Sequence, residues 1–224
     1  NLPRAVAQAR MVVIATPVLA IREVMQQIAP DLPEGCVVTD VGSTKERVME
    51  WAAELLPPSV SFVGGHPMAG KETHGIDNAD ADLFRDRTYC ICPAVDAQEG
   101  AVRSVIGMVR LVGAEPLYLD PKEHDQYAAA VSHLPLLVST ALFSLLRASP
   151  AWSDLAPMAS SGFRDLTRLA SGDPQMSHDI FLTNRDAAIH WLDRMVEELR
   201  RYRNLLDGDA EKLMETFAMA QAER

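Results

Sequence analysis

Short apolar runs alternate with amphipathic stretches along the first half of the chain. Runs with the length and composition of buried strands occupy residues 11–15, 37–41, 61–63, 88–92 and 116–119. Apolar residues recur at helical spacing over residues 18–28, 44–55 and 99–111. Strands that alternate with helical segments in this way are typical of an α/β sheet with crossover helices.

The second half of the chain has a helical pattern throughout. Apolar residues recur every three or four positions over residues 123–147, 178–205 and 210–222. We therefore predict two domains, a sheet-containing domain over residues 1–120 and an all-helical domain over residues 121–224. No internal repeat or low-complexity tract interrupts either part.

Composition narrows the class of protein. The 224 residues include 31 acidic and 21 basic ones, a formal net charge of −10, which argues against a nucleic-acid partner because phosphate binding needs a basic face. The cysteines Cys36, Cys90 and Cys92 are interpreted as buried, inert thiols of a reducing cytoplasm rather than as disulfides or metal ligands. We find no apolar run of about 18 residues and no signal peptide, and predict a soluble cytoplasmic protein without membrane contact or bound metal.

Residues 64–70, Gly-Gly-His-Pro-Met-Ala-Gly, carry the main candidate chemistry. They follow a strand-like run, and we expect Pro67 to end that strand and the glycines to allow positive φ and close backbone approach. Ligands of open α/β sheets bind beyond the carboxyl ends of the strands. His66 is therefore a candidate acid or base. The alternative is a glycine-rich turn that contains a histidine by chance.

The same seven residues resemble a motif of the prephenate/arogenate (cyclohexadienyl) dehydrogenase family of tyrosine biosynthesis. Further matching strings follow in family order: Asp-Val-Gly-Ser-Thr-Lys at 40–45, His-Asp at 124–125, Ser-His-Leu-Pro at 132–135, Gly-Phe-Arg-Asp-Leu-Thr-Arg-Leu-Ala at 162–170 and Asp-Pro at 173–174. The resemblance implies that residues 1–120 are the C-terminal part of a Rossmann-type nucleotide-binding domain. It also implies that residues 121–224 form a helical substrate-binding domain through which two copies pair as a homodimer.

The family reaction implied by this resemblance is the NAD- or NADP-dependent oxidative decarboxylation of a cyclohexadiene. A hydride passes from the hydroxyl-bearing ring carbon to the nicotinamide, the ring carboxylate leaves as CO2, and the ring becomes aromatic. By resemblance His66 is the catalytic histidine, and Ser43 lies beside it near the hydroxyl and the nicotinamide. For Ser43 an N-cap of the following helix is the alternative.

The other candidate site residues also come from matched strings. Arg168 is the expected anchor of the ring carboxylate, which a guanidinium can hold with two parallel hydrogen bonds. Glu72 and Asp165 are expected in an ionic cluster at the pocket mouth, and a surface salt-bridge network is the alternative. Ser161 is a further substrate-binding candidate.

His133 is a substrate-binding candidate that precedes Pro135 by two residues. The proline cannot donate a hydrogen bond to the carbonyl of Val131, so we expect the helix to kink near His133. A kink with freed carbonyls is common at binding sites. A core histidine bonded to the backbone explains the position equally well.

Thr16 and Pro17 end the first strand-like run and are, with Ser43, the expected cofactor-binding residues. A nicotinamide enzyme of this architecture opens with a strand, a Gly-x-Gly-x-x-Gly turn and a helix, and no such turn occurs in the 224 residues. We expect that about 60 upstream residues are absent, judged by the length of a mononucleotide-binding half. We also expect this chain alone to bind the cofactor weakly.

Two positions depart from the family and keep the substrate open. Leu136 replaces a second histidine, and Ser177 follows Asp-Pro-x-Met where many relatives have tryptophan. Prephenate, arogenate and an amino-substituted analogue all remain possible, as does either nicotinamide cofactor. Two other functions compete: a non-catalytic truncated fragment that acts as a dimerisation unit, and another member of the β-hydroxyacid dehydrogenase group, which usually presents a catalytic lysine.

Overall fold

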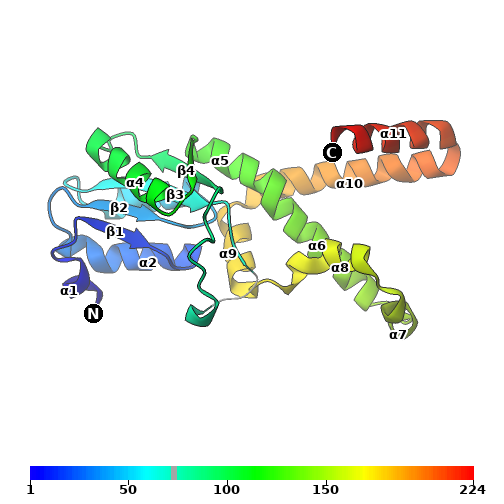
Figure 1. Ribbon diagram of the computed structural model, residues 1–224, viewed down its shortest axis with the longest axis horizontal. Helices are drawn as coiled ribbons and strands as arrows, with labels where there is room; N and C mark the ends of the chain where they lie inside the picture. Colours follow the sequence, from blue (N-terminus) through cyan, green and yellow to red (C-terminus); the bar gives the residue numbers. More distant parts are fainter. Residues whose placement is uncertain (72–74) are drawn as a thin grey trace.

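The computed structural model of the chain describes residues 1–71 and 75–224 and begins with a five-stranded sheet of order β1-β2-β3-β4-β5 (Figure 1). The strands are β1 (Met11–Ile14), β2 (Val37–Asp40), β3 (Ser61–Pro67), β4 (Thr88–Pro93) and β5 (Glu115–Tyr118). Pairing is parallel except between β3 and β4, which run antiparallel. The α/β alternation predicted from the sequence is therefore confirmed, with one reversed strand pair.

Helices cover both faces of this sheet. They are α1 (Leu2–Val6), α2 (Val18–Ile28), α3 (Glu46–Leu55) and α4 (Glu99–Leu111), with short 3-10 turns η1 (Ala29–Asp31) and η2 (Ile76–Asn78). Successive residues of one strand point to opposite faces. Accordingly, Val38 packs with α2 and α3 in one core cluster, whereas Val37 packs with α4 in the other.

Strand β3 extends further than expected, which corrects the interpretation of residues 64–70 as a turn. His66 and Pro67 remain within the strand, and His66 lies opposite Cys90 of β4. Neither Gly64 nor Gly65 has a positive φ. Pro67 is tolerated because the strand ends at this residue.

The remaining elements are all helical. They are α5 (Pro121–Ala128), η3 (Ala129–His133), α6 (Leu134–Arg147), α7 (Trp152–Leu155), η4 (Ala156–Met158), α8 (Ser161–Thr167), η5 (Arg168–Ser171), α9 (Pro174–Thr183), α10 (Arg185–Gly208) and α11 (Ala210–Glu223). Figure 1 shows α5 and α9 against the sheet-containing part, while α6, α10 and α11 extend away from it. The predicted helix over residues 178–205 is divided at Asn184, which ends α9 and precedes α10.

At His133, where we expect a kink, the structure has a π-helical turn, η3. Pro135 follows in the first turn of α6, where its missing N–H leaves no hydrogen bond broken within that helix. A π turn inserts an extra residue into the helix and is frequent at functional sites. It joins α5, which touches the sheet domain, to α6, which leads away from it.

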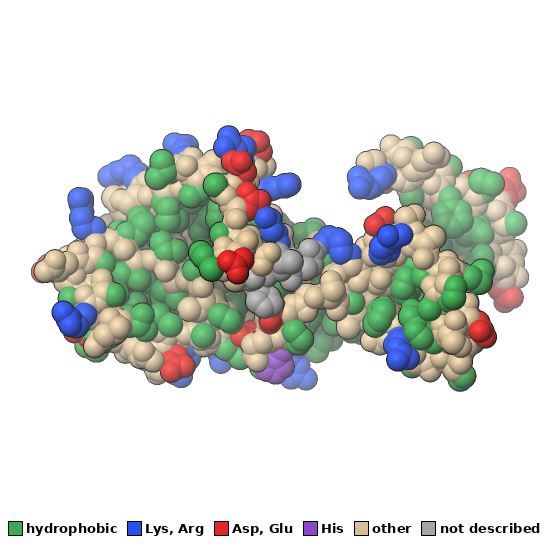
Figure 2. All heavy atoms as spheres, turned by 60° about the horizontal axis from the view of Figure 1, so that its bottom comes forward, with side chains coloured by type: hydrophobic (Ala, Val, Ile, Leu, Met, Phe, Trp, Pro, Cys, Tyr) green, Lys and Arg blue, Asp and Glu red, His purple; other side chains and the backbone are tan. Residues whose placement is uncertain are grey.

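The α5–η3–α6 run corrects the expectation that no apolar segment reaches membrane length. Residues Pro121–Arg147 are long and apolar enough to cross a membrane by length and composition, and only 17% of the most apolar window is buried. Exposed large apolar side chains of this run include Tyr127, Val131 and Leu145, and Figure 2 shows apolar side chains at the surface of both parts of the molecule. A half-exposed apolar helix of this kind also fits a surface that a partner protein covers.

Candidate active site

A buried ion pair lies under the ends of β2 and β3. The Lys45 ammonium contacts the Asp40 carboxylate, both side chains are 0% exposed, and the same ammonium donates to the carbonyl of Gly65 at 2.7 Å. Asp40 also accepts the backbone N–H groups of Gly42 at 2.8 Å and Gly65 at 3.1 Å. Every polar atom of the pair thus has partners, which is the condition for keeping charges in a protein interior.

Gly65 permits this arrangement because it has no side chain. A Cβ atom built on Gly65 would lie 2.6 Å from the Asp40 carbonyl oxygen and 2.9 Å from the Tyr89 ring. No real Cβ atom approaches backbone so closely. The close approach expected from the glycine pair is therefore present, although the positive φ is not.

His66 follows Gly65 in β3 and contacts a second histidine. Its Nδ1 lies 2.9 Å from Nε2 of His124, and Nδ1 of His124 lies 2.8 Å from Oδ1 of Asp125. His124 and Asp125 belong to α5, so this contact crosses from the sheet domain to the helical domain. All three side chains are buried.

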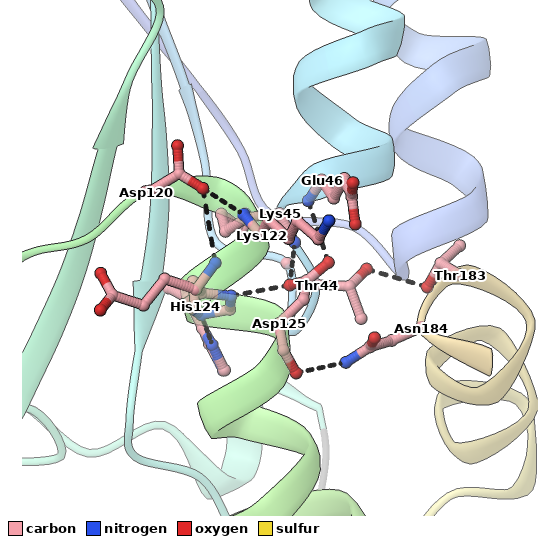
Figure 3. A network of polar contacts seen from close by, with 12 residues as sticks. Thr44, Lys45, Glu46, Asp120, Lys122, His124, Asp125, Thr183 and Asn184 are labelled. Atoms are coloured by element: carbon pink, nitrogen blue, oxygen red, sulfur yellow. Dashed lines mark hydrogen bonds and ion pairs between the residues drawn. The ribbon is translucent and has the colours of Figure 1, made fainter. Parts of the chain in front are cut away.

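Asp125 also caps helix α3. Its Oδ1 accepts the N–H of Lys45 at 2.7 Å and its Oδ2 accepts the N–H of Glu46 at 3.0 Å (Figure 3). A carboxylate at a helix N-terminus satisfies free N–H groups and interacts favourably with the helix dipole. This corrects the alternative in which Ser43 caps the helix, since α3 has no capping side chain from its own flank.

Further contacts fasten the two parts together beside Asp125 (Figure 3). The hydroxyls of Thr44 and Thr183 lie 2.8 Å apart, and the Asn184 amide donates to the Asp125 carbonyl at 2.7 Å. Asp179 of α9 accepts the N–H of Leu19 in the first turn of α2 at 3.4 Å. Helices α2 and α3 are therefore both capped by carboxylates of the helical domain.

His133 lies in the π turn and is buried. Its Nδ1 is 3.3 Å from the Asn184 amide nitrogen, while its Nε2 is buried without a hydrogen-bond partner among the described residues. Burial lowers the pKa of His133 from 6.5 to about 4, against the opposing effect of Asp125. The ring is thus neutral near pH 7.

Burial and charge keep His66 neutral as well. Desolvation lowers the pKa of His66 well below 6.5, and the nearby His124, Lys45 and His133 lower it further. A neutral imidazole has one nitrogen that accepts a hydrogen bond. His66 can therefore act as an acceptor over the whole neutral range.

The predicted cofactor-binding residues lie where β1 and β2 end. The Thr16 hydroxyl is buried and has no hydrogen-bond partner within residues 1–71 and 75–224, and Pro17 is the N-cap residue of α2. Ser43 is half-buried in the loop between β2 and α3. An unpartnered hydroxyl and a half-buried serine at neighbouring strand ends fit the nicotinamide part of a dinucleotide.

The other predicted substrate residues lie apart from this cluster. Ser161, Asp165 and Arg168 are exposed on α8 and η5, which pack against α6, away from the sheet in Figure 1. Glu72 lies outside the described residues, so the ionic cluster stays a prediction. Leu136 is half-buried in α6.

Sequence reasoning missed four members of the buried cluster: Lys45, His124, Asp125 and Asn184. His124 and Asp125 lie in the first turns of α5, whose start is capped by Asp120, which accepts the N–H groups of residues 122 and 123. The available signal was the His-Asp pair itself, since two adjacent titratable side chains are seldom both buried without a role. In the part of the chain that the structure describes, no group of three His, Cys, Asp or Glu side chains could hold a metal ion.

The twisted sheet with crossover helices, its strand-end histidine and the all-helical second part define a Rossmann-type nucleotide-binding protein. Two family models cover nearly the whole chain: the prephenate dehydrogenase nucleotide-binding domain matches residues 2–118 and the prephenate dehydrogenase dimerization domain matches residues 120–219. The chain belongs to the prephenate dehydrogenase family.

Individual relatives agree with this assignment. Prephenate dehydrogenase of Bacillus subtilis is 34% identical over 96% of this chain, which spans 59% of that protein's length. Prephenate dehydrogenase of Aquifex aeolicus, solved with hydroxyphenyl propionate and NAD+, superposes with a TM-score of 0.92 at 29% identity over 100% of this chain and 79% of that one. Synechocystis arogenate dehydrogenase gives a TM-score of 0.85 at 27% identity over 100% and 81% of the two chains.

Proposed function

We propose that the protein catalyses the NAD- or NADP-dependent oxidative decarboxylation of prephenate to 4-hydroxyphenylpyruvate or of arogenate to tyrosine. The observation that carries the proposal is a buried, neutral histidine at a strand end, held by the His124–Asp125 pair of the helical domain. Family membership and the names of the relatives support the same reaction. Support for a non-catalytic fragment, or for a dehydrogenase of another group, is absent from these comparisons.

The chemistry assigns a proton-accepting role to His66. As the hydride leaves the ring carbon, the hydroxyl on that carbon loses its proton to the imidazole and becomes a carbonyl. The bond to the ring carboxylate then breaks, CO2 leaves, and the ring becomes aromatic. We assign Ser43 to the same hydroxyl, and Ser161 and His133 to substrate binding.

Bound NAD or NADP supplies the hydride acceptor. We assign Thr16, Pro17 and Ser43 to the nicotinamide end, because they lie where β1 and β2 end and the Thr16 hydroxyl has no partner in the part of the chain that the structure describes. We place the division between the nucleotide-binding part and the helical part at residues 120 and 121, and the enzyme in the cytoplasm.

The test is a spectrophotometric assay that follows the formation of reduced nicotinamide. Prephenate and arogenate are each supplied with NAD and with NADP to the full-length protein, because we expect the chain of 224 residues alone to bind the cofactor weakly. We expect turnover with at least one pair. No reduction above background in any of the four combinations contradicts the proposed function.

We expect Arg168→Ala to raise KM while kcat changes little. Losing a charge-assisted pair to the ring carboxylate costs about 1.5–3 kcal/mol of binding free energy, and the loss applies to every substrate with that carboxylate. Arg164→Ala, four residues earlier on exposed α8, is the matched control. An unchanged KM with lowered thermal stability would make Arg168 structural.

We expect the protein to form a homodimer through its helical domain. Large apolar side chains remain exposed along α6 and α10, among them Leu145, which is 71% exposed, and Leu199, and an exposed apolar surface of this kind marks an interface. The matching family model is named a dimerization domain. Sedimentation at micromolar concentration should give twice the chain mass. The Leu145→Glu variant should shift the protein toward monomer. The control variant, Arg103→Glu on α4, should leave the dimer unchanged. A wild-type monomer of 24.6 kDa contradicts the prediction.

A further inference from the structure

Hydrogen-bond polarity fixes how protons are placed along the His66–His124–Asp125 chain. The Asp125 carboxylate already accepts the N–H groups of Lys45 and Glu46, and an ionised carboxylate can only accept. Nδ1 of His124, 2.8 Å from this carboxylate, must therefore carry a proton. In a neutral His124, Nε2 is then the acceptor, and the proton between the two rings belongs to Nδ1 of His66. Nε2 of His66 is then the ring nitrogen that keeps its lone pair.

Charges around the two rings differ strongly. His66 is next to Gly65, whose carbonyl accepts the Lys45 ammonium, whereas His124 is next to the Asp125 carboxylate. A positive charge is therefore disfavoured on His66 and favoured on His124. His133 of the π turn also acts on both rings, and Cys90 lies opposite His66 in β4.

We propose that His124 is a positioning residue that presents His66 with Nε2 unprotonated and takes over its Nδ1 proton during turnover. The proposal deepens, and rests on, the proposed dehydrogenase function. The substrate hydroxyl proton binds to Nε2 of His66, the Nδ1–H bond of His66 breaks, and that proton binds to Nε2 of His124. The electron pair of the substrate O–H bond stays on the oxygen that becomes the carbonyl. The positive charge ends on His124 beside Asp125, and no further reactant is needed.

This relay joins the two domains. His66 comes from β3, while His124 and Asp125 come from α5, and Asp125 simultaneously caps α3. Docking of the helical domain therefore sets the proton position on the base. Asp125 accepts from Nδ1 of His124 throughout, in the orienting role that the aspartate of a Ser-His-Asp triad has.

A direct test reads the tautomer of His66 by 15N NMR of histidine-labelled protein at pH 8. Long-range 1H–15N correlations distinguish a protonated from an unprotonated ring nitrogen, and His66→Asn identifies the His66 signals by their loss. We expect a proton on Nδ1 and none on Nε2, although free neutral histidine favours the opposite tautomer. A proton on Nε2 of His66 in the wild-type protein overturns the proposal.

Two variants separate orientation from proton transfer. His124→Gln keeps a carbonyl that can accept from Nδ1 of His66 but cannot take up its proton, and His124→Leu removes both functions. We expect kcat to fall about tenfold or more in the His124→Gln variant and about a hundredfold or more in the His124→Leu variant, within the range of general acid–base effects. KM should be unchanged in both. The Nδ1–H tautomer of His66 should persist in His124→Gln and be lost in His124→Leu. His178→Gln, whose side chain is 60% exposed, is the control.

The rate of the glutamine variant distinguishes a relay from a structural role. Glutamine holds the ring of His66 in place but cannot take up its proton, so a His124→Gln variant with wild-type kcat overturns the relay. Absence of turnover in the wild-type protein would instead contradict the proposed function, while the tautomer still decides the pairing of the two rings.

Discussion

His66→Asn should lower kcat by about two to four orders of magnitude, the usual cost of removing a general base, while KM changes little. Asparagine keeps a polar group near Nδ1 but has no nitrogen that can take up the hydroxyl proton. His66 is buried between β4 and α5, opposite Cys90 and in contact with His124. Steady-state kinetics with the substrate that the assay identifies measure both constants.

The pH dependence of the wild-type rate gives a second check on His66. Its pKa is lowered from 6.5 mainly by burial, so the ring stays unprotonated as the pH falls from 8 through 6.5, and activity should persist over this range. Below this pH range, protonation of His66 removes the acceptor and the rate declines.

His178→Asn serves as the control for the His66→Asn variant because the side chain of His178 is largely exposed. Near-wild-type turnover in His66→Asn would remove His66 from the mechanism.

Lys45→Met should lower the free energy of unfolding by about 3–5 kcal/mol, the cost of breaking a buried pair. The methionine fills a similar volume, but the Asp40 carboxylate is left buried with only two backbone N–H donors. Chemical denaturation with two independent probes measures the change. We expect Asp40→Asn combined with Lys45→Met to recover part of the loss, because the double variant buries no charge.

An exposed pair provides the matched control for this prediction. Lys71 and Asp80 lie 2.7 Å apart, but their side chains are 39% and 41% exposed, and solvent screens such pairs. Lys71→Met should leave the midpoint of denaturation unchanged within error. Equal stability losses in Lys45→Met and Lys71→Met would show that burial of the Asp40–Lys45 pair has no energetic consequence.

The sequence by itself determined the alternation of strands and helices, the helical second half and the importance of His66. These are local properties: a period of two or of 3.6 residues is visible within ten residues, and the string at residues 64–70 is contiguous. The sequence also located the disturbance near His133, because Pro135 lacks the N–H that a regular helix would use.

The tertiary structure decided what surrounds His66. Asp125 caps a helix that begins 79 residues earlier and holds the ring of His124, and no local pattern distinguishes such a carboxylate from one that starts its own helix. The antiparallel pairing of β3 with β4 likewise turned a presumed glycine turn into a strand. Both features depend on long-range packing, because hydrogen-bond donors left free at one helix or strand end are satisfied by whichever acceptor the fold brings there.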